Sequence, residues 1–146
     1  MITQKYLNEL TYEVVGAAIE VHKEMGRGLL ESIYHKCLKE ELLLRKINFL
    51  TEMKIPVHYK GKELDIDFRC DLLVENSLII ELKSVQEMSN VHEAQLLTYM
   101  KLLKSPKGIL INFNCNNIFN EGQKTFVNEY FKLLPKDYEK TEVKTD

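Results

Sequence analysis

The sequence predicts an α/β (α+β) domain, in which helices flank a mixed β-sheet in the order ααβββαβ, with a further strand near the end. Three observations predict this class. Apolar residues recur three and four apart over the first 25 residues, as in a helix that buries one stripe. They alternate from Phe49 onward, as in strands. Residues 109–113 are apolar except for Asn112, as in a strand buried on both faces. The 146 residues correspond to a single domain over 1–146, with a solvated tail from about residue 136.

Three helices are expected. Thr3 is the predicted N-cap of the first helix, which ends before a Gly-Arg-Gly turn. The second helix covers about residues 29–45. The third is predicted to start with Asn90 as its cap and Glu93 at the third helical position, the arrangement of a capping box.

The predicted strands follow the second helix. The first covers residues 49–59, and Pro56 places it at a sheet edge because proline donates no hydrogen bond to a neighbouring strand. The second covers residues 64–74, the third Leu78–Lys83, and a last strand residues 123–127.

Composition narrows the class of protein. Hydrophobic residues make up 45% and charged residues 29%, values typical of a globular domain and not of a disordered or fibrous chain. The net charge of −2 excludes a general polycationic nucleic-acid wrapper, although a local basic surface such as Lys101, Lys104 and Lys107 is compatible with it.

The sequence also indicates a compartment. Cys37, Cys70 and Cys115 are widely spaced and form no CxxC pair, which predicts reduced thiols. Neither an apolar secretory leader nor an apolar run of bilayer length is visible in the sequence. We therefore expect a cytoplasmic protein without a membrane partner.

Two carboxylates are expected to face each other in the sheet. If residues 75–77 form a three-residue hairpin loop, Val74 pairs with Leu78, and Asp71 lies opposite Glu81. A two-residue turn would dismantle this pair. Facing carboxylates need a raised pKa or a bound divalent cation, and hard oxygen ligands suit Mg²⁺ or Mn²⁺. Lys83, diagonal to Asp71, supplies one compensating charge.

Each of these signals also has an ordinary structural explanation. A Glu-x-Lys at a strand end is commonly a solvated face, although the apolar strand before Glu81 favours a buried site. Gln95 and Tyr99 share one helix face with His92 nearby, which is equally typical of a half-exposed helix. Glu31 in a first helical turn complements the helix dipole without any further role.

Taken together, the motifs resemble a known family. Gly28-x-x-Glu31-x-x-Tyr34 is similar to the signature of the GxxExxY proteins, which belong to the PD-(D/E)XK nuclease superfamily with its restriction-endonuclease-like fold. The resemblance covers about residues 10–113. It includes Asp71, Glu81-x-Lys83, and the helix motif with Gln95 and Tyr99. One departure is Cys70, which stands where the superfamily motif has proline.

The resemblance implies roles for these residues. The implied metal ligands are Asp71, Glu81, the main-chain carbonyl of Leu82, and Glu31, with Mg²⁺ or Mn²⁺ as cofactor. Lys83 would stabilise charge on the phosphate, and Gln95 would position water, metal or phosphate. The implied substrate contacts are Tyr99, Tyr34 and His92.

The first function hypothesis is a metal-dependent nuclease that hydrolyses phosphodiester bonds, in DNA more than in RNA. The alternative is a catalytically silent module with the same fold that binds nucleic acid or a partner protein. A homodimer or partner would help so small a chain to select its substrate. A third reading, hydrolysis of another phosphorylated substrate, lacks a Walker-type phosphate loop in the sequence.

Overall fold

The computed structural model describes residues 2–138, so most of the tail predicted from about residue 136 lies outside the described residues. The helices are α1 (Gln4–Met25), α2 (Glu31–Leu44), α3 (Asn90–Leu102) and α4 (Glu129–Leu133), with a π-helical turn η1 (Ile118–Gly122). The strands are β1 (Phe49–Lys54), β2 (Val57–Tyr59), β3 (Lys62–Leu64), β4 (Arg69–Val74), β5 (Leu78–Lys83), β6 (Lys107–Asn112) and β7 (Gln123–Val127).

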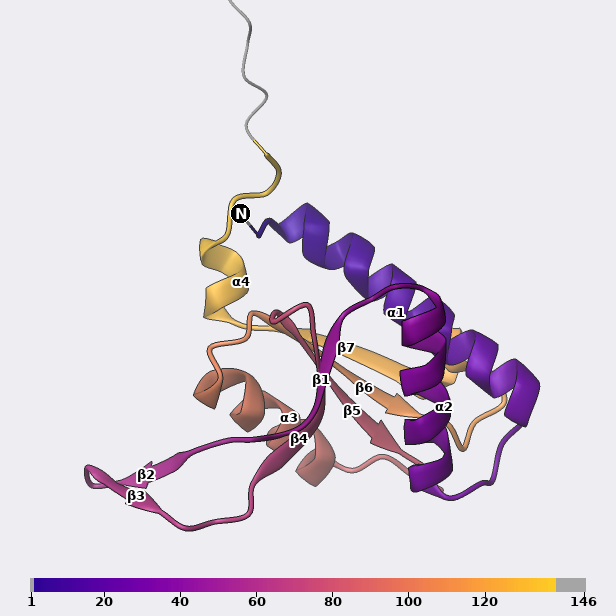
Figure 1. Cartoon of the computed structure of the whole chain (residues 1–146), viewed down its shortest axis with the longest axis horizontal. Coiled ribbons are helices and arrows are strands. Elements are labelled where there is room, and N and C mark those ends of the chain that lie inside the picture. Colours follow the sequence, from indigo (N-terminus) through magenta and orange to yellow (C-terminus); the bar gives the residue numbers. More distant parts are fainter. Residues whose placement is uncertain (1, 139–146) are drawn as a thin grey trace, which may run out of the picture.

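Five strands form one mixed sheet in the order β1-β4-β5-β6-β7, and β2 with β3 forms a separate two-stranded ribbon (Figure 1). β5 and β6 run parallel, whereas the other neighbours in the sheet are antiparallel. Ile109, Leu110 and Ile111 of β6 are buried, as predicted, and the strand begins two residues earlier than predicted, with Lys107 and Gly108 also buried. The predicted class, a mixed sheet flanked by helices, is confirmed.

The helices bury both faces of the sheet. α1 and α2 pack on one face, where Leu7, Leu38 and Ile80 are fully buried in one apolar cluster. α3 packs on the other face, where Leu96 and Met100 join a second cluster. α3 lies so close to β6 that a Cβ added at Gly108 would come within 2.8 Å of the Met100 sulfur.

The helix starts test two predictions. Thr3 caps α1 as predicted, since its hydroxyl accepts a hydrogen bond from the Tyr6 amide at 3.0 Å. At α3 the predicted cap is one residue off. Ser89 is the N-cap, and its amide donates to Nδ1 of His92 at 3.3 Å. A histidine ring thus takes the place that the capping-box pattern gives to a glutamate.

The first two predicted strands are each interrupted. At Pro56 the chain leaves β1 and enters the ribbon, because proline cannot continue the ladder. The chain returns through residues 65–68, where the amides of Ile66 and Phe68 each bond the carbonyl two residues earlier at 3.0 Å. This tight local bonding separates β3 from β4. The third strand, Leu78–Lys83, has the predicted bounds.

The two ends of the described chain meet. The amides of Gln4 and Lys5 donate to the carbonyls of Pro135 and Lys136 at 2.9 and 3.0 Å. In Figure 1 this junction and the β2–β3 ribbon lie at opposite sides of the sheet. Between residues 2 and 138, none of the helices has the length and apolar character needed to cross a bilayer.

Candidate active site

The β4–β5 hairpin is closed at its turn and opens at its far end. Val74 pairs with Leu78 across a three-residue loop, which confirms the predicted register. The regular pairing ends at Leu72 and Ile80. Beyond this point the next two residues of the hairpin, Asp71 and Glu81, use their side chains instead.

Each carboxylate accepts a hydrogen bond from the backbone of the opposite strand. The Asp71 amide donates to Oε1 of Glu81 at 2.9 Å, and the Leu82 amide donates to Oδ2 of Asp71 at 2.8 Å. These bonds hold both carboxylates at the end of the sheet, and each keeps one further oxygen for a ligand.

Keeping both carboxylates of this pair ionised in a buried place costs free energy. Glu81 is 4% exposed. Its burial, followed by the charge of Asp71, raises the pKa of Glu81 to about 8. At neutral pH and without a cation, the buried pair therefore retains a proton, because desolvation and the like charge both disfavour a second anion. A bound cation would remove this penalty.

Glu31 reaches the same place from α2. A pocket of about 320 Å³ is lined by Glu31, Ser32, His35, Glu52, Asp71 and Leu82. Burial raises the pKa of Glu31, the charge of Lys83 opposes this rise, and the charge of Asp71 adds to it. The structure thus brings together Glu31, Asp71 and Leu82, as the sequence predicted. The charge of Lys83 acts on Glu31 in the same region.

A tyrosine fixes the connection that precedes Glu31. The Tyr34 hydroxyl donates to the Gly26 carbonyl at 2.6 Å and accepts from the Leu29 amide at 3.2 Å. Its ring stacks on Phe113, with 4.4 Å between centroids. Gly28, in the same connection, has a φ of 87°, which favours glycine. Tyr34 is completely buried and its hydroxyl contacts shape this connection; the substrate contact expected for it stays a prediction.

A hydrogen bond also joins this connection to the residue that follows β5. The Ser84 hydroxyl donates to the Leu29 carbonyl at 2.6 Å. Ser84 directly follows Lys83, so the start of α2 and the lysine are fixed relative to each other. In the described part of the chain, the Lys83 ammonium forms no ion pair with a carboxylate.

α3 contributes from the other face of the sheet. Nε2 of Gln95 donates to the Tyr99 hydroxyl at 2.8 Å, so the two residues share a helix face as predicted. Burial and the charges of Glu81 and Asp71 raise the pKa of Tyr99 to about 12. Tyr99 is only 3% exposed, which makes the half-buried Gln95 the more accessible of the two.

His92 is half-buried and is occupied with capping α3. Its Nδ1 accepts the Ser89 amide, as described above. The charge of a protonated His92 is also the smallest of the causes that lower the pKa of Glu31, after those of Lys83 and His35. The structure therefore keeps His92 near the site without giving it a contact to another candidate residue.

Two pocket residues, His35 and Glu52, were absent from the sequence prediction. His35 lies four residues after Glu31 on α2, and that spacing could have identified it. Its Nε2 is buried and has no hydrogen-bond partner among residues 2–138. Glu52 lies opposite Asp71 in the β1–β4 register but is left out of the pairing, with a φ of 50°. No sequence signal predicts this left-handed residue within a strand.

One expected basic residue is placed differently. Lys101 and Lys104 are exposed, but Lys107 is 5% exposed and its ammonium donates to Oδ1 of Asn8 at 2.7 Å. The reason is that Lys107 begins the interior strand β6, so its side chain is enclosed by neighbouring elements. The predicted basic surface is therefore reduced to two of its three lysines.

The comparisons with known proteins agree with this geometry. A model of the PD-(D/E)XK nuclease superfamily matches residues 8–125. The chain belongs to this superfamily. A structure titled "Crystal structure of SSO0001" is 25% identical, with a TM-score of 0.51 over 66% of this chain and 48% of that chain. The chain thus spans about half the length of that protein. A comparison with curated protein sequences finds no match.

PD-(D/E)XK nucleases typically use divalent metals, and the donor chemistry here fits such an ion. Asp71, Glu81 and Glu31 offer carboxylate oxygens, and Mg²⁺ prefers one or two carboxylates together with waters and substrate phosphates. Among residues 2–138, no group of three or more His, Cys, Asp or Glu side chains is gathered around one point.

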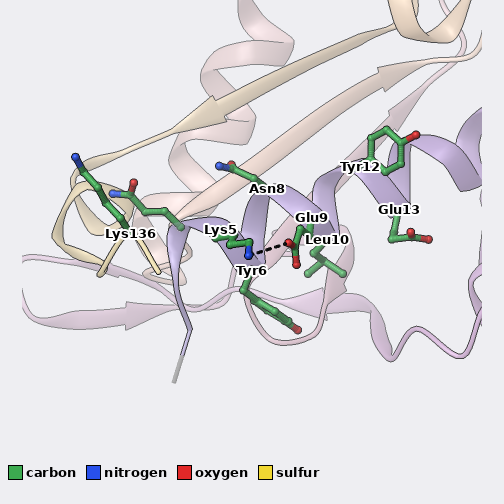
Figure 2. A pocket seen from close by; sticks show the side chains of 9 residues that line it. Lys5, Tyr6, Asn8, Glu9, Leu10, Tyr12, Glu13 and Lys136 are labelled. Atoms are coloured by element: carbon green, nitrogen blue, oxygen red, sulfur yellow. Dashed lines mark ion pairs between the residues drawn. The ribbon is translucent and has the colours of Figure 1, made fainter. Parts of the chain in front are cut away.

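A wider pocket lies far from these carboxylates. It has a volume of about 840 Å³ and follows the first turns of α1, where Lys5 and Glu9 form an ion pair at 3.9 Å (Figure 2). Its acidic and basic residues are exposed to solvent and converge on no common point. Chemistry, and not volume, therefore identifies the hairpin end as the candidate active site of this PD-(D/E)XK protein.

Proposed function

We propose that this chain is a metal-dependent nuclease that hydrolyses phosphodiester bonds in nucleic acid, with DNA favoured over RNA. The observation that carries the proposal is the buried Asp71–Glu81 pair, in which each carboxylate is held by the backbone of the opposite strand. Such a pair is costly unless a cation binds it, and superfamily membership supports nuclease chemistry at this position.

The residues divide the work as follows. Asp71, Glu81 and the Leu82 carbonyl would hold a divalent cation, with Glu31 as an additional carboxylate. Such a cation makes bound water nucleophilic at neutral pH and offsets charge on the phosphate. Lys83 presents its ammonium beside this position and stabilises the charge that develops on the phosphate oxygens. Gln95 orients the substrate or its attacking water, and Tyr99 holds Gln95 in place.

Within the superfamily we propose placement in the GxxExxY family. The support is the spacing of Gly28, Glu31 and Tyr34, together with the structural reason for it: the glycine turn and the tyrosine clamp fix the start of α2, where Glu31 lies. We further propose a cytoplasmic location, because the three cysteines have the spacing of reduced thiols.

Cleavage assays with purified variants test the function. We expect Asp71→Ala, Glu81→Ala and Lys83→Ala each to lower Mg²⁺- or Mn²⁺-dependent cleavage of DNA by about a hundredfold or more, because each removes a charge from the site. Lys132→Ala, on the exposed surface of α4, is the matched control and should cleave as the wild type does. Circular dichroism checks that every variant is folded.

Two outcomes would contradict the proposal. Equal cleavage by the wild type and Glu81→Ala would identify a contaminating nuclease. Nucleic-acid binding without cleavage in either metal would instead favour the catalytically silent binding module.

A further inference from the structure

The β2–β3 ribbon stands apart from the rest of the fold. Figure 1 shows it projecting away from the five-stranded sheet. Its strands pair only with each other, from Val57 with Leu64 at the base to Tyr59 with Lys62 at the tip. Neither strand is therefore needed to complete the main sheet.

The ribbon has no buried apolar face. Residues 58–63 are all exposed, and Tyr59 retains 63% of its surface. An isolated two-stranded hairpin is marginally stable in water. The chain nevertheless builds one here, without an apolar face that would pack on the described part of the protein.

The tip is stiffened locally. Lys60 and Gly61 have φ values of 48° and 81°, as in the two-residue type I′ turns that match the twist of a hairpin. The Lys60 ammonium lies 5.5 Å from the centre of the Tyr59 ring, which adds a cation–π contact. The two strands are thus held in one shape at the end farthest from the sheet.

Charges along the ribbon are sorted between base and tip. Each acidic side chain of this segment has a basic neighbour, whereas the two lysines of the tip, Lys60 and Lys62, have no carboxylate partner among the described residues. The three pairs are Glu63 with His58 at 4.0 Å, Asp65 with Lys54 at 3.8 Å, and Asp67 with Arg69 at 2.6 Å. The tip therefore carries two ammonium groups without an ion-pair partner, and Glu63, whose histidine partner is charged only when protonated, is the one carboxylate in the ribbon strands.

The base of the ribbon is fixed against the candidate active site. The Ile55 amide donates to the Phe68 carbonyl at 2.7 Å, which joins the two legs. The Phe68 ring packs on Tyr99, with 4.5 Å between centroids. Asp71 follows two residues after Arg69, the first residue of β4. The ribbon consequently leaves the sheet at the end where Asp71 and Glu81 lie.

We propose that this ribbon is a DNA-binding arm that enters the major groove of a B-form duplex and contacts phosphates through Lys60 and Lys62. The major groove of B-DNA is about 12 Å wide and admits a two-stranded β-ribbon. The deep, narrow major groove of an A-form RNA helix excludes such an element. The inference rests on the proposed nuclease function for its choice of nucleic acid as partner, and it makes duplex DNA the substrate class.

Binding measurements without cleavage test the arm. Fluorescence anisotropy of a labelled B-form duplex is followed at several salt concentrations, with all proteins carrying Glu81→Gln to prevent cleavage. Adding Lys60→Gln and Lys62→Gln should lower the slope of log affinity against log salt by about 1.8, because each phosphate contact contributes about 0.9. At 0.1 M salt this corresponds to binding weaker by some tens of fold.

The matched control removes two charges elsewhere. Lys132→Gln with Lys136→Gln changes two exposed lysines at the opposite side of the sheet, and should leave both affinity and slope unchanged (Figures 1 and 2). All four lysines are exposed, so thermal unfolding should be the same in the parent and both variants.

The outcomes separate the arm from the nuclease. Four results would overturn the arm: no duplex binding by the parent, an unchanged slope after the tip substitutions, an equal loss in the control, or an equal loss on duplex RNA. If the wild type binds DNA through the tip lysines but cleaves nothing in Mg²⁺ or Mn²⁺, the result would support the DNA-binding arm and contradict the proposed nuclease function.

Discussion

The two ends of the β4–β5 hairpin hold the same two strands together in different ways. At the turn, Val74 and Leu78 are fully buried and the backbone pairing is regular. At the other end, side-chain carboxylates accept the backbone amides, and Glu81 is buried as an acid beside a second acid. The first end stabilises the fold, whereas the second is destabilised by like charge and is suited to bind a cation.

The candidate active site thus lies at the end of the hairpin where regular strand pairing stops and side chains accept the backbone amides. Glu52 adds to the contrast, since a left-handed residue within β1 lies opposite Asp71 and not opposite the apolar part of β4. Backbone conformations of this kind cost free energy and persist where the surroundings hold them. The β1–β4 pairing continues on both sides of Glu52, at Thr51 with Leu72 and at Met53 with Cys70, and holds it in place.

The largest expected effect is at the apolar part of the hairpin. Ile80→Ala should lower the free energy of unfolding by about 2–5 kcal/mol, because Ile80 is fully buried and its truncation leaves a cavity. Urea unfolding followed by circular dichroism measures this loss. A loss as small as that of an exposed position would show that the strands are not held together mainly by their apolar end.

A divalent metal should stabilise the protein by binding at the Asp71–Glu81 end of the hairpin alone. At a hundredfold excess over its dissociation constant, Mn²⁺ is expected to raise the free energy of unfolding of the wild type by about 2.7 kcal/mol, since it binds only the folded state. Asp71→Asn combined with Glu81→Gln should abolish this gain in thermal unfolding experiments. An equal shift in both proteins would place the metal elsewhere on the chain.

The smallest expected effect is the pH dependence of the pair without metal. The pKa of Glu81 is raised from 4.5 to about 8 in the folded protein, so the folded state keeps a proton that the unfolded state has lost. Stability should therefore fall as the pH rises through this window, by about 1 kcal/mol for each pH unit, so the change between neighbouring pH values is the smallest of the three effects.

Glu81→Gln removes this titration, so the variant should gain stability over the wild type between about pH 5 and about pH 8 when EDTA is present. Glu40→Gln, an exposed carboxylate on α2, is the matched control. Parallel pH curves for the wild type and Glu81→Gln would contradict the assigned repulsion.

The sequence predicts the register of the β4–β5 hairpin because that register depends on simple geometry. A three-residue loop at Glu75–Ser77 is enough to bring Asp71 opposite Glu81, and period-two alternation places Lys83 on the Glu81 face. The capping of α1 by Thr3 follows from local hydrogen bonding in the same way. These features depend on residues close together in the chain.

Features that depend on distant contacts were not predictable. Helical spacing of the apolar residues indicates that Tyr34 is buried, but its stack on Phe113, which directly follows β6, depends on a contact with a distant part of the chain. Lys107 looks like a surface cation until β6 is known to be an interior strand. Glu52 required the β1–β4 pairing to be known before it could be placed beside Asp71.

The meeting of the two chain ends at Gln4 and Pro135 has a practical consequence. Because α1 begins where the segment after α4 passes, a label attached to a cysteine introduced at Gln4 and one introduced at Lys136 would sit at nearly the same point. That point lies across the molecule from the β2–β3 ribbon (Figure 1). Labelled and surface-immobilised forms of the protein should therefore engage a long duplex without obstruction by the attachment.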